Sequence, residues 1–212
     1  MSSRNLTCGV VMVVVVLALG SASAEVFEVP ALQEAMVTTG ADGLPVGLDS
    51  VPAVGDSIEG RYLRAVFSFD LSFLPPGAVI SSAVVHTRVD AAYGNPASLG
   101  SLWAGRILET TGQPSVDIQP QWGTSTLAGA MVEVTGEMTG GSDLTVDLTA
   151  QLKGYFPTAE YSPDPGRAVV RFQFSTPSSA NGTEDFCYLS RARLALDVSL
   201  PAPITSRFTG PS

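Results

Sequence analysis

Hydrophobic and polar residues alternate in short runs along most of the chain after residue 24. Gly, Pro, Asn and Asp separate one run from the next, and no long helical period appears. Because successive side chains of a β-strand point to opposite faces, this period of two predicts strands with one buried and one wet face. The pattern therefore predicts an all-β sandwich or barrel. Its clearest runs lie at residues 63–71, 83–90, 143–149, 168–175 and 192–199.

Less regular segments complete the predicted layout. Apolar residues over 148–156 are spaced for one or two helical turns before Pro157, which cannot continue a helix. Two interrupted runs, at residues 99–108 and 131–138, predict further strands. Segments rich in Gly, Pro, Ser and Asp predict long surface connections at residues 39–59, 157–167 and 176–185.

The first 24 residues have the pattern of a secretory signal peptide. Arg4 precedes an unbroken apolar run at residues 9–19, and Ala22, Ser23 and Ala24 supply small residues for cleavage. We therefore expect a secreted or cell-surface protein with a single β-sandwich domain at residues 25–200 and a flexible tail at residues 201–212. No second apolar segment has the length of a membrane span, so none is expected.

Composition narrows the classes of function. The chain has 20 Asp and Glu against 11 Lys and Arg, a formal net charge of −9, which argues against nucleic acid as a partner. Cys187 is the only cysteine after the signal segment, so we expect a buried thiol and no internal disulfide. Motifs for zinc, serine or phosphate chemistry are absent from the sequence, and no catalytic residue, metal ligand or cofactor is predicted.

Structural calcium stays open, because carboxylates and backbone carbonyls can bind Ca²⁺ without a histidine. Asp42, Asp49 and Asp56 share one predicted loop, although their spacing differs from that of an EF-hand. A solvated loop is the alternative reading. Asp70 and Asp147 have predicted structural roles instead: Asp70 closes the turn before a double proline, and Asp147 caps the short helix.

The corner Pro75-Pro76-Gly77 connects the two strongest alternating runs. Strands that are consecutive in sequence are usually neighbours in space, so we expect these two to pair in antiparallel fashion. Pairing would bring Arg64 close to His86 and Arg88 on one face, a basic patch suited to a uronate or a sulfate. The alternative is that Arg64 and Arg88 pair with neighbouring carboxylates on a wet sheet face.

The same corner carries a family resemblance. Residues 64–85, RAVFSFDLSFLPPGAVISSAVV, resemble the pattern R-x-L-L-R-F-D-L-S-x-L-P-x-G-A-x-I-x-S-A-x-L of the secreted DNRLRE domains, which are related to disaggregatase repeats and carbohydrate-binding module family 96. Residues 144–155, 167–172 and 186–196 resemble later segments of that family in the expected order. The resemblance implies a jelly-roll-like β-sandwich that serves as an accessory module for polysaccharide. Ser68, where the family commonly has arginine, and Arg191-Ala192-Arg193, where an acidic residue often follows the serine, depart from it.

Aromatic rings stack on the apolar faces of sugars, so they are the natural candidates for a carbohydrate site. Trp122 lies in a polar context and is predicted to be exposed, whereas Trp103 lies in an apolar run and is predicted to be in the core. Tyr188 is a further candidate ring. The predicted ligand-binding residues are Arg64, His86, Arg88, Trp122 and Tyr188. Asn181-Gly182-Thr183 also forms a glycan acceptor sequon, which acts only in a glycosylating host.

These observations predict a secreted non-catalytic module that binds polysaccharide or attaches to cell-surface or matrix material. Two other classes stay open: a purely structural surface or matrix protein without a small ligand, and a polysaccharide hydrolase or lyase whose site the sequence does not display. Core and turn residues carry the resemblance, and a function resides in sites placed on a fold rather than in the fold itself.

Overall fold

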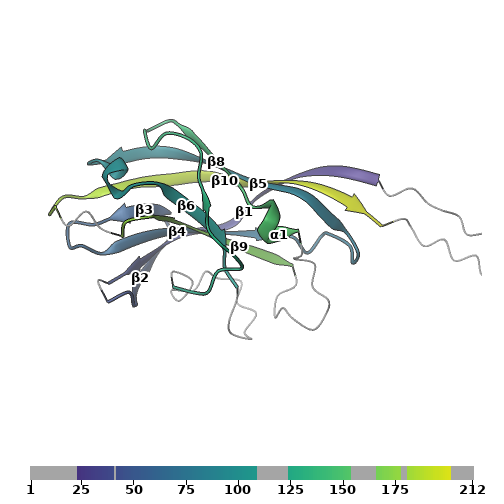
Figure 1. The fold of residues 1–212 in the computed structure, drawn as a ribbon, viewed down its shortest axis with the longest axis horizontal. Coiled ribbons are helices and arrows are strands. Elements are labelled where there is room, and N and C mark those ends of the chain that lie inside the picture. The colour runs from purple at the N-terminus through teal and green to yellow at the C-terminus, as the bar shows by residue number, and fades with distance from the viewer. Residues whose placement is uncertain (1–22, 41, 109–123, 154–165, 178–180, 202–212) are drawn as a thin grey trace, which may run out of the picture.

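The computed structural model describes residues 23–40, 42–108, 124–153, 166–177 and 181–201, which form an almost all-β fold (Figure 1). Every strand pairing among them is antiparallel. The predicted all-β antiparallel fold with one short α-helix is confirmed. Its elements are β1 (Ser23–Thr39), β2 (Pro45–Asp49), β3 (Ala53–Asp56), β4 (Tyr62–Asp70), β5 (Val79–Tyr93), the 3-10 turn η1 (Pro96–Leu99), β6 (Leu102–Arg106), β7 (Val132–Glu133), β8 (Asp143–Asp147), α1 (Thr149–Leu152), β9 (Arg167–Phe174) and β10 (Asp185–Leu200).

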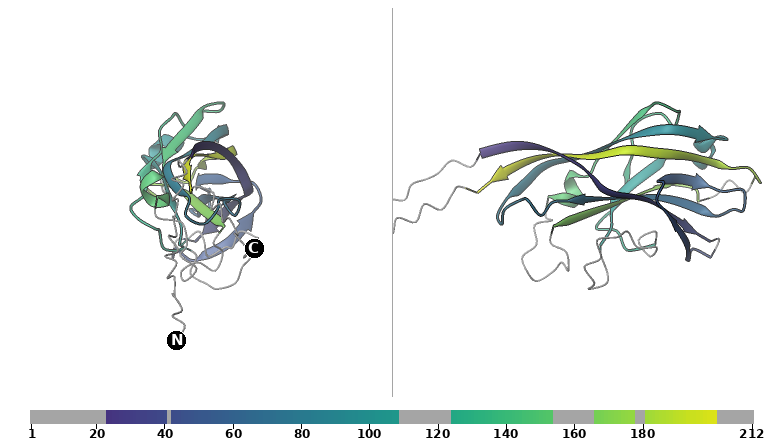
Figure 2. Two further views of the ribbon diagram at one scale, coloured as in Figure 1. Left: turned by 90° about the vertical axis from the view of Figure 1, so that its right-hand side faces the viewer. Right: turned by 180° about the vertical axis from the view of Figure 1, so that it is seen from behind.

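The strands form two layers around one hydrophobic core (Figure 2). The first layer contains β8, β5, β10 and the first half of β1, and the second contains the other half of β1 with β4, β9, β6 and β7. Phe67 and Phe172 from the second layer meet edge to face at 5.5 Å between ring centroids. Val85 and Leu194 of the first layer are fully buried in the same core. The faces predicted to be apolar are thus the faces that meet between the layers.

Strand β1 belongs to both layers. Its residues 23–30 pair with β10, its residues 31–39 pair with β4, and the register shifts between Ala31 and Gln33. The shift changes which side chains of β1 face the main core. Before the shift this side carries the buried Val29. After the shift it carries Glu34, which lies opposite the core residue Phe67 of β4. Strand β3 makes a second link between the layers by pairing with both β10 and β4.

The corner Pro75-Pro76-Gly77 carries the chain from one layer to the other. Strand β4 ends against β9, where Asp70 pairs with Arg167, and β5 begins against β10, where Val79 pairs with Ser199. The prediction that these two consecutive strands pair is therefore wrong. The apolar side chains of Leu74 and Ala78 are buried at the corner, which favours a crossing over the core instead of a hairpin.

The segment at residues 39–59 is not the long surface connection that its composition predicts. It contains β2 and β3, and all four residues of β3 are buried between β10 and β4. A four-residue strand shows too little alternation to stand out in sequence. The interrupted run at 99–108 contains β6 as predicted, whereas the run at 131–138 yields only the two residues of β7.

The two ends of the fold lie side by side, because Ser23 of β1 pairs with Leu200 of β10 (Figure 1). Residues 1–22 and 202–212 lie outside the described residues, so the signal peptide and the tail stay predictions. Most of the predicted connection at residues 157–167 also lies outside them. Within the described part of the chain, neither helix has the length and apolar character needed to cross a membrane.

Candidate functional site

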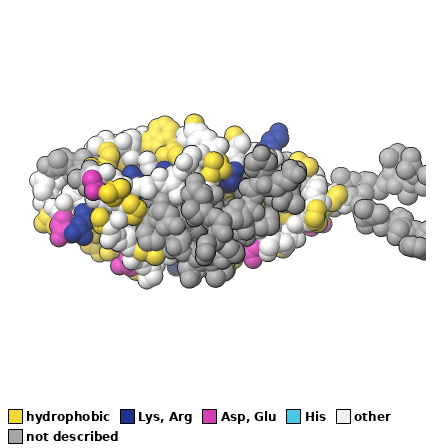
Figure 3. All heavy atoms as spheres, turned by 90° about the horizontal axis from the view of Figure 1, so that it is seen from below, with side chains coloured by type: hydrophobic (Ala, Val, Ile, Leu, Met, Phe, Trp, Pro, Cys, Tyr) yellow, Lys and Arg dark blue, Asp and Glu magenta, His cyan; other side chains and the backbone are white. Residues whose placement is uncertain are grey.

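The predicted basic patch does not form, because its residues lie on different layers. His86 and Arg88 alternate with the buried Val85 and Val89 on β5, so they face outward from the first layer. Arg64 alternates with buried residues of β4 and faces outward from the second layer. The core separates the two surfaces. On the underside of the molecule, the described basic and acidic side chains are scattered among hydrophobic ones (Figure 3).

Arg64 lies on a largely covered face. On this face Arg171 of β9 is buried, donates from Nη1 to the Ser125 carbonyl at 3.0 Å, and lies near Arg64. Burial lowers the pKa of Arg171 to about 10, and the positive charge of Arg64 adds to this effect. Tyr62 and Gln173 help to line a cavity of about 50 Å³ beside Arg64. Ligand sites typically have roughly 300 Å³ or more, so this cavity is too small for a sugar ring.

His86 and Arg88 occupy an ordinary polar sheet face. His86 lies between Thr145 of β8 and Arg193 of β10 in register, and Arg88 lies opposite Asp143 of β8. The neighbouring Arg193 forms an exposed ion pair with Glu28 at 3.0 Å. Charges of both signs thus alternate across this layer, as the alternative reading of Arg88 anticipates.

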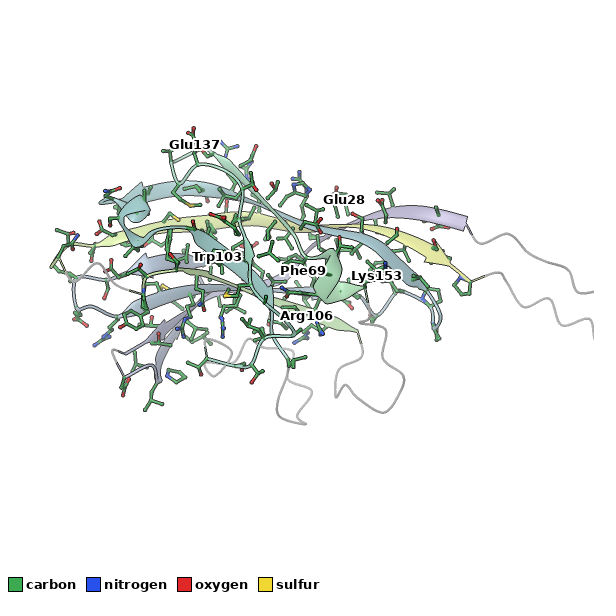
Figure 4. All side chains as sticks on the ribbon, viewed as in Figure 1. Glu28, Phe69, Trp103, Arg106, Glu137 and Lys153 are labelled. Carbon is green, nitrogen blue, oxygen red and sulfur yellow. The ribbon has the colours of Figure 1, made fainter. Side chains whose placement is uncertain are left out.

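The two tryptophans give different outcomes. Trp122 lies outside the described residues, so its predicted exposure stays a prediction. Trp103 is only partly buried and alternates with the buried Leu102 and Ala104 on β6 (Figure 4). Its predicted place in the core is therefore wrong, because the apolar residues around it include both faces of the strand.

Tyr188 belongs to a group of three touching rings, which we call the aromatic cluster: Tyr93 of β5 with Phe186 and Tyr188 of β10. Tyr93 stacks on Phe186 at 4.9 Å between centroids and meets Tyr188 edge to face at 5.7 Å. Phe186 and Tyr188 alternate with the buried Cys187, so they project away from the main core. Tyr93 is 47% exposed and Tyr188 is partly exposed, whereas Phe186 is nearly covered. The cluster offers an apolar surface with two phenolic hydroxyls at the outside of the molecule.

Two glycines bring the backbone close beneath these rings. Gly55 of β3 lies opposite Phe186 with φ of 141°, and a Cβ at this position would collide with the Asp185 carbonyl and with Phe186 Cα. Gly94 follows Tyr93 directly with φ of 62°, where a Cβ would collide with the Glu184 carbonyl. Both conformations strongly favour glycine. The close contact fixes the positions of Tyr93 and Phe186.

A second group of residues supports the cluster from below. Ala53, Leu63 and Phe186 are buried together, and Met36 of β1 and Tyr188 pack against them. Because these residues come from β1, β3, β4 and β10, the cluster rests on the strands that link the two layers. The aromatic cluster is therefore supported by the paired strands of the fold rather than by a loop.

Carboxylates lie beside the cluster. Glu34 projects from the same side of β1 as Met36, and its Oε1 accepts a hydrogen bond from the Ala192 backbone N–H at 3.3 Å. Burial raises the pKa of Glu34 above its usual value, and the negative charge of nearby Asp90 raises it as well, against the lowering effect of the Ala192 hydrogen bond. Asp90 is exposed on β5 where the register against β10 shifts between Tyr188 and Leu189. Asp90 thus lies beside Tyr188 in the strand pairing, and Glu34 lies near Asp90.

Asp185 joins the segments that flank the cluster. The side chain is buried, and its oxygens accept hydrogen bonds from the Asn95 N–H at 2.6 Å and from Asn181 Nδ2 at 2.7 Å. Its own N–H donates to Asp56 Oδ1 at 3.1 Å. The turn after β5, the segment before β10 and strand β3 are thereby tied together directly next to Phe186.

Other singled-out residues have structural roles. Asp70 Oδ1 accepts from the Ser72 N–H at 2.9 Å, and Asp147 Oδ1 accepts from the Thr149 N–H at 2.8 Å. Hydrogen bonds from the side chains of Ser72 and Thr149, and after them the bonds from these backbone groups, lower the pKa of the two carboxyls. Asp70 closes its turn as predicted, and Asp147 stands one residue before the N-cap position at the start of the helix. Cys187 is buried, as predicted, and burial raises the pKa of its thiol to about 12.

The three aspartates considered for calcium lie in different environments. Asp42 Oδ1 and Asp49 Oδ1 each accept a local backbone N–H in an exposed turn. Asp56 is buried on β3. The described residues contain no group of three or more His, Cys, Asp or Glu side chains placed to hold a metal ion.

Sequence reasoning identified Tyr188 but missed its partners. Tyr93, Phe186, Glu34 and Asp185 were not among the predicted binding residues. The alternation of Phe186 and Tyr188 around Cys187 and the glycine after Tyr93 are the signals that could have found the cluster. No protein-family model matches the chain, and no curated protein matches it in sequence.

Proposed function

We propose that the chain is a secreted, non-catalytic module that attaches to polysaccharide or to other cell-surface or matrix material through the aromatic cluster. The exposure of Tyr93 at 47%, on a ring that is stacked and held from below, is the observation that carries this proposal. A ring that a folded protein leaves exposed while fixing its position is suited to stacking on the apolar face of a sugar.

Rigidity supports binding at this surface. Tyr93, Phe186 and Tyr188 contact one another, and Gly55 and Gly94 fix the backbone beneath them. Little side-chain entropy remains to be lost when a ligand stacks on such rings. The small cavity beside Arg64 offers no comparable surface.

The charges near the cluster favour neutral or amino sugars over acidic ones. Carboxylates accept hydrogen bonds from sugar hydroxyls and attract ammonium groups, and they repel uronates and sulfates. Asp90 supplies such a carboxylate beside Tyr188, and Glu34 lies near Asp90. Arg64, the residue first considered for an acidic sugar, lies on the other layer.

The sequence adds independent support. The amino-terminal pattern of Arg4 followed by an apolar run fits an exported protein. Residues 64–85 resemble secreted domains that act as accessory modules for polysaccharide. Tyr93 lies outside the residues that carry the resemblance, whereas Phe186 and Tyr188 fall within its last segment at residues 186–196.

Binding of purified protein to soluble neutral glucan, glucosamine oligomers and polygalacturonate, measured by calorimetry, tests the proposal. We expect saturable binding to a neutral or amino-sugar polymer, and Tyr188→Ala and Tyr93→Ala should each weaken it roughly tenfold, as expected for a lost stacking contact of about 1.4 kcal/mol. Phe73→Ala is the matched control, because Phe73 is equally exposed at 48% but contacts Phe27.

Other results would favour the competing classes. If the purified chain binds none of the three polymers and self-associates, the result would favour a structural matrix protein. Release of reducing ends or of unsaturated products from the same polymers would identify a hydrolase or lyase. Stronger binding to polygalacturonate that survives Tyr188→Ala would contradict the proposed site.

A further inference from the structure

Asn181, Gly182 and Thr183 form a motif that the proposed function does not use. All three residues are exposed, and they precede β10. Gly182 has φ of 74°, and no atom lies within 4 Å of the place where a Cβ would stand. An asparagine followed by an unhindered glycine is the arrangement in which the next backbone nitrogen can reach the side-chain carbonyl carbon.

We propose that Asn181 is a site of spontaneous deamidation through a succinimide. The Gly182 nitrogen, having lost its proton to hydroxide, bonds to Asn181 Cγ, and the Cγ–Nδ2 bond breaks. The departing nitrogen takes a proton from water and leaves as ammonia. A second water then opens the ring to give aspartate or isoaspartate. No atom changes its oxidation state overall, and water is the only co-reactant.

The local hydrogen bonds favour this attack. Thr183 donates to Asn181 Oδ1 from its backbone N–H at 2.8 Å and from Oγ1 at 2.6 Å. Negative charge develops on this oxygen when the nitrogen adds to Cγ. Two donors already directed at it stabilise that charge, as the donors of an oxyanion hole do.

The product conflicts with its surroundings. Asn181 Nδ2 donates to Asp185 Oδ2 at 2.7 Å, and deamidation replaces this donor with a second carboxylate. Two carboxylates this close repel each other, and the buried Asp185 loses a hydrogen bond. Asp185 also holds the Asn95 N–H and directly precedes Phe186, so the change loosens the end of the molecule that carries the aromatic cluster.

Peptide mapping of the full chain after storage in mildly alkaline and mildly acidic buffers tests the chemistry. We expect conversion of Asn181 to aspartate and isoaspartate, faster in the alkaline buffer. Asn95 is an internal control, because it precedes Pro96, whose nitrogen carries no proton to lose. Thr183→Val keeps the N–H donor but removes the hydroxyl, and should slow conversion roughly tenfold, the effect of one hydrogen bond to a developing charge.

Two measurements decide the structural consequence and can overturn the proposal. Asn181→Asp should lower the melting temperature relative to the unmodified chain, and Asn181→Ser, which adds no charge, should lower it less. An unmodified Asn181 after prolonged alkaline storage, or a glycan on its amide in the secreted protein, would overturn the deamidation, and an Asn181→Asp variant as stable as the parent would overturn its structural consequence. Because mass and melting are measured without any polysaccharide, these outcomes do not depend on the proposed binding function.

Discussion

Buried hydroxyls show how single residues are used differently on the two layers. Thr87 Oγ1 on β5 donates to the Ser190 carbonyl at 2.8 Å, whereas Ser68 Oγ on β4 is buried without a hydrogen-bond partner among the described residues. Ser68 is the position at which the resembled family commonly has arginine. Val66 and Val169 pack together on this covered face, and Ser68 itself is fully buried there, so a long charged side chain would have to displace apolar neighbours.

Ser68→Ala should therefore stabilise the fold. Removing an unpaired buried hydroxyl removes a desolvation cost of about 1 kcal/mol, which corresponds to a rise of roughly 2–4 °C in melting temperature for a domain of this size. Thermal unfolding followed by circular dichroism measures the effect. Thr87→Val is the contrasting variant, since it removes a buried hydroxyl that has a partner and should lower the melting temperature. A fall for Ser68→Ala would show that this hydroxyl has a partner after all.

At the scale of elements, the side chain of Glu34 stabilises the point at which β1 stops pairing with β10. Pro30 is the last residue of β1 opposite β10, and beyond it Glu34 reaches the Ala192 N–H that β1 no longer pairs. Ala192 lies in an irregular stretch of β10 in which Arg191 has φ of 53°. The carboxyl satisfies a backbone donor, yet it is partly buried and lies near Asp90.

Glu34→Gln tests this balance through pH. Folding raises the pKa of Glu34, chiefly by burial, so the folded state favours the protonated carboxyl. The contribution of Glu34 to the free energy of unfolding is therefore largest below the pKa of the unfolded chain. This contribution declines as the pH rises through the pKa of the folded state. Glutamine keeps an acceptor for Ala192 without the charge. We expect the variant to be more stable than the parent at neutral pH and to lose this advantage in acid.

Chemical denaturation at several pH values measures the difference. Glu28→Gln is the matched control, because the Glu28 carboxylate is exposed and pairs with Arg193. This control should show no gain at neutral pH. An equal gain in both variants would mean that net charge, rather than the site of Glu34, sets the result.

Elements with strong alternation could be predicted from sequence, and their partners could not. β4, β5, β8, β9 and β10 all follow a period of two in sequence, but only β5, β8 and β10 keep a wholly or partly exposed second face, whereas β4 and β9 are buried on both faces over most of their length. The same period says nothing about which strand lies alongside, so Arg64 and His86 were placed together wrongly. Tyr93 and Phe186 become neighbours only through the pairing of β5 with β10, which no local pattern encodes. The two-layer path of β1 escaped detection for the same reason, whereas β3 was missed because its four residues show too little alternation.

The whole molecule is closed by strands that belong to both layers. β1 pairs with β10 and then with β4, and β3 repeats this link at the other end. Neither layer can separate without breaking hydrogen bonds in a shared strand. Side chains of both layers also fill one core, so burial couples them as well.

This coupling predicts a single cooperative unfolding transition. Calorimetric and van't Hoff enthalpies should agree, as they do for a two-state domain. Leu194→Ala in the first layer and Phe172→Ala in the second should each destabilise the whole transition, by about 2–5 kcal/mol, because both side chains are fully buried. Two separable transitions, or a variant that shifts only part of one, would contradict the coupling.

The pairing of Glu25 with Val198, which keeps the two ends of the proposed secreted domain side by side, has a consequence for how the module is held. Polypeptide continuing from either end of the fold leaves from one pole, while Tyr93 and Phe186 stand near the start of β10, at the opposite pole (Figure 1). If the module is attached through its amino or carboxyl end, the aromatic cluster therefore points away from the point of attachment. Domains fused at either end leave the aromatic cluster accessible. Tandem copies of the module can all present the cluster in the same direction.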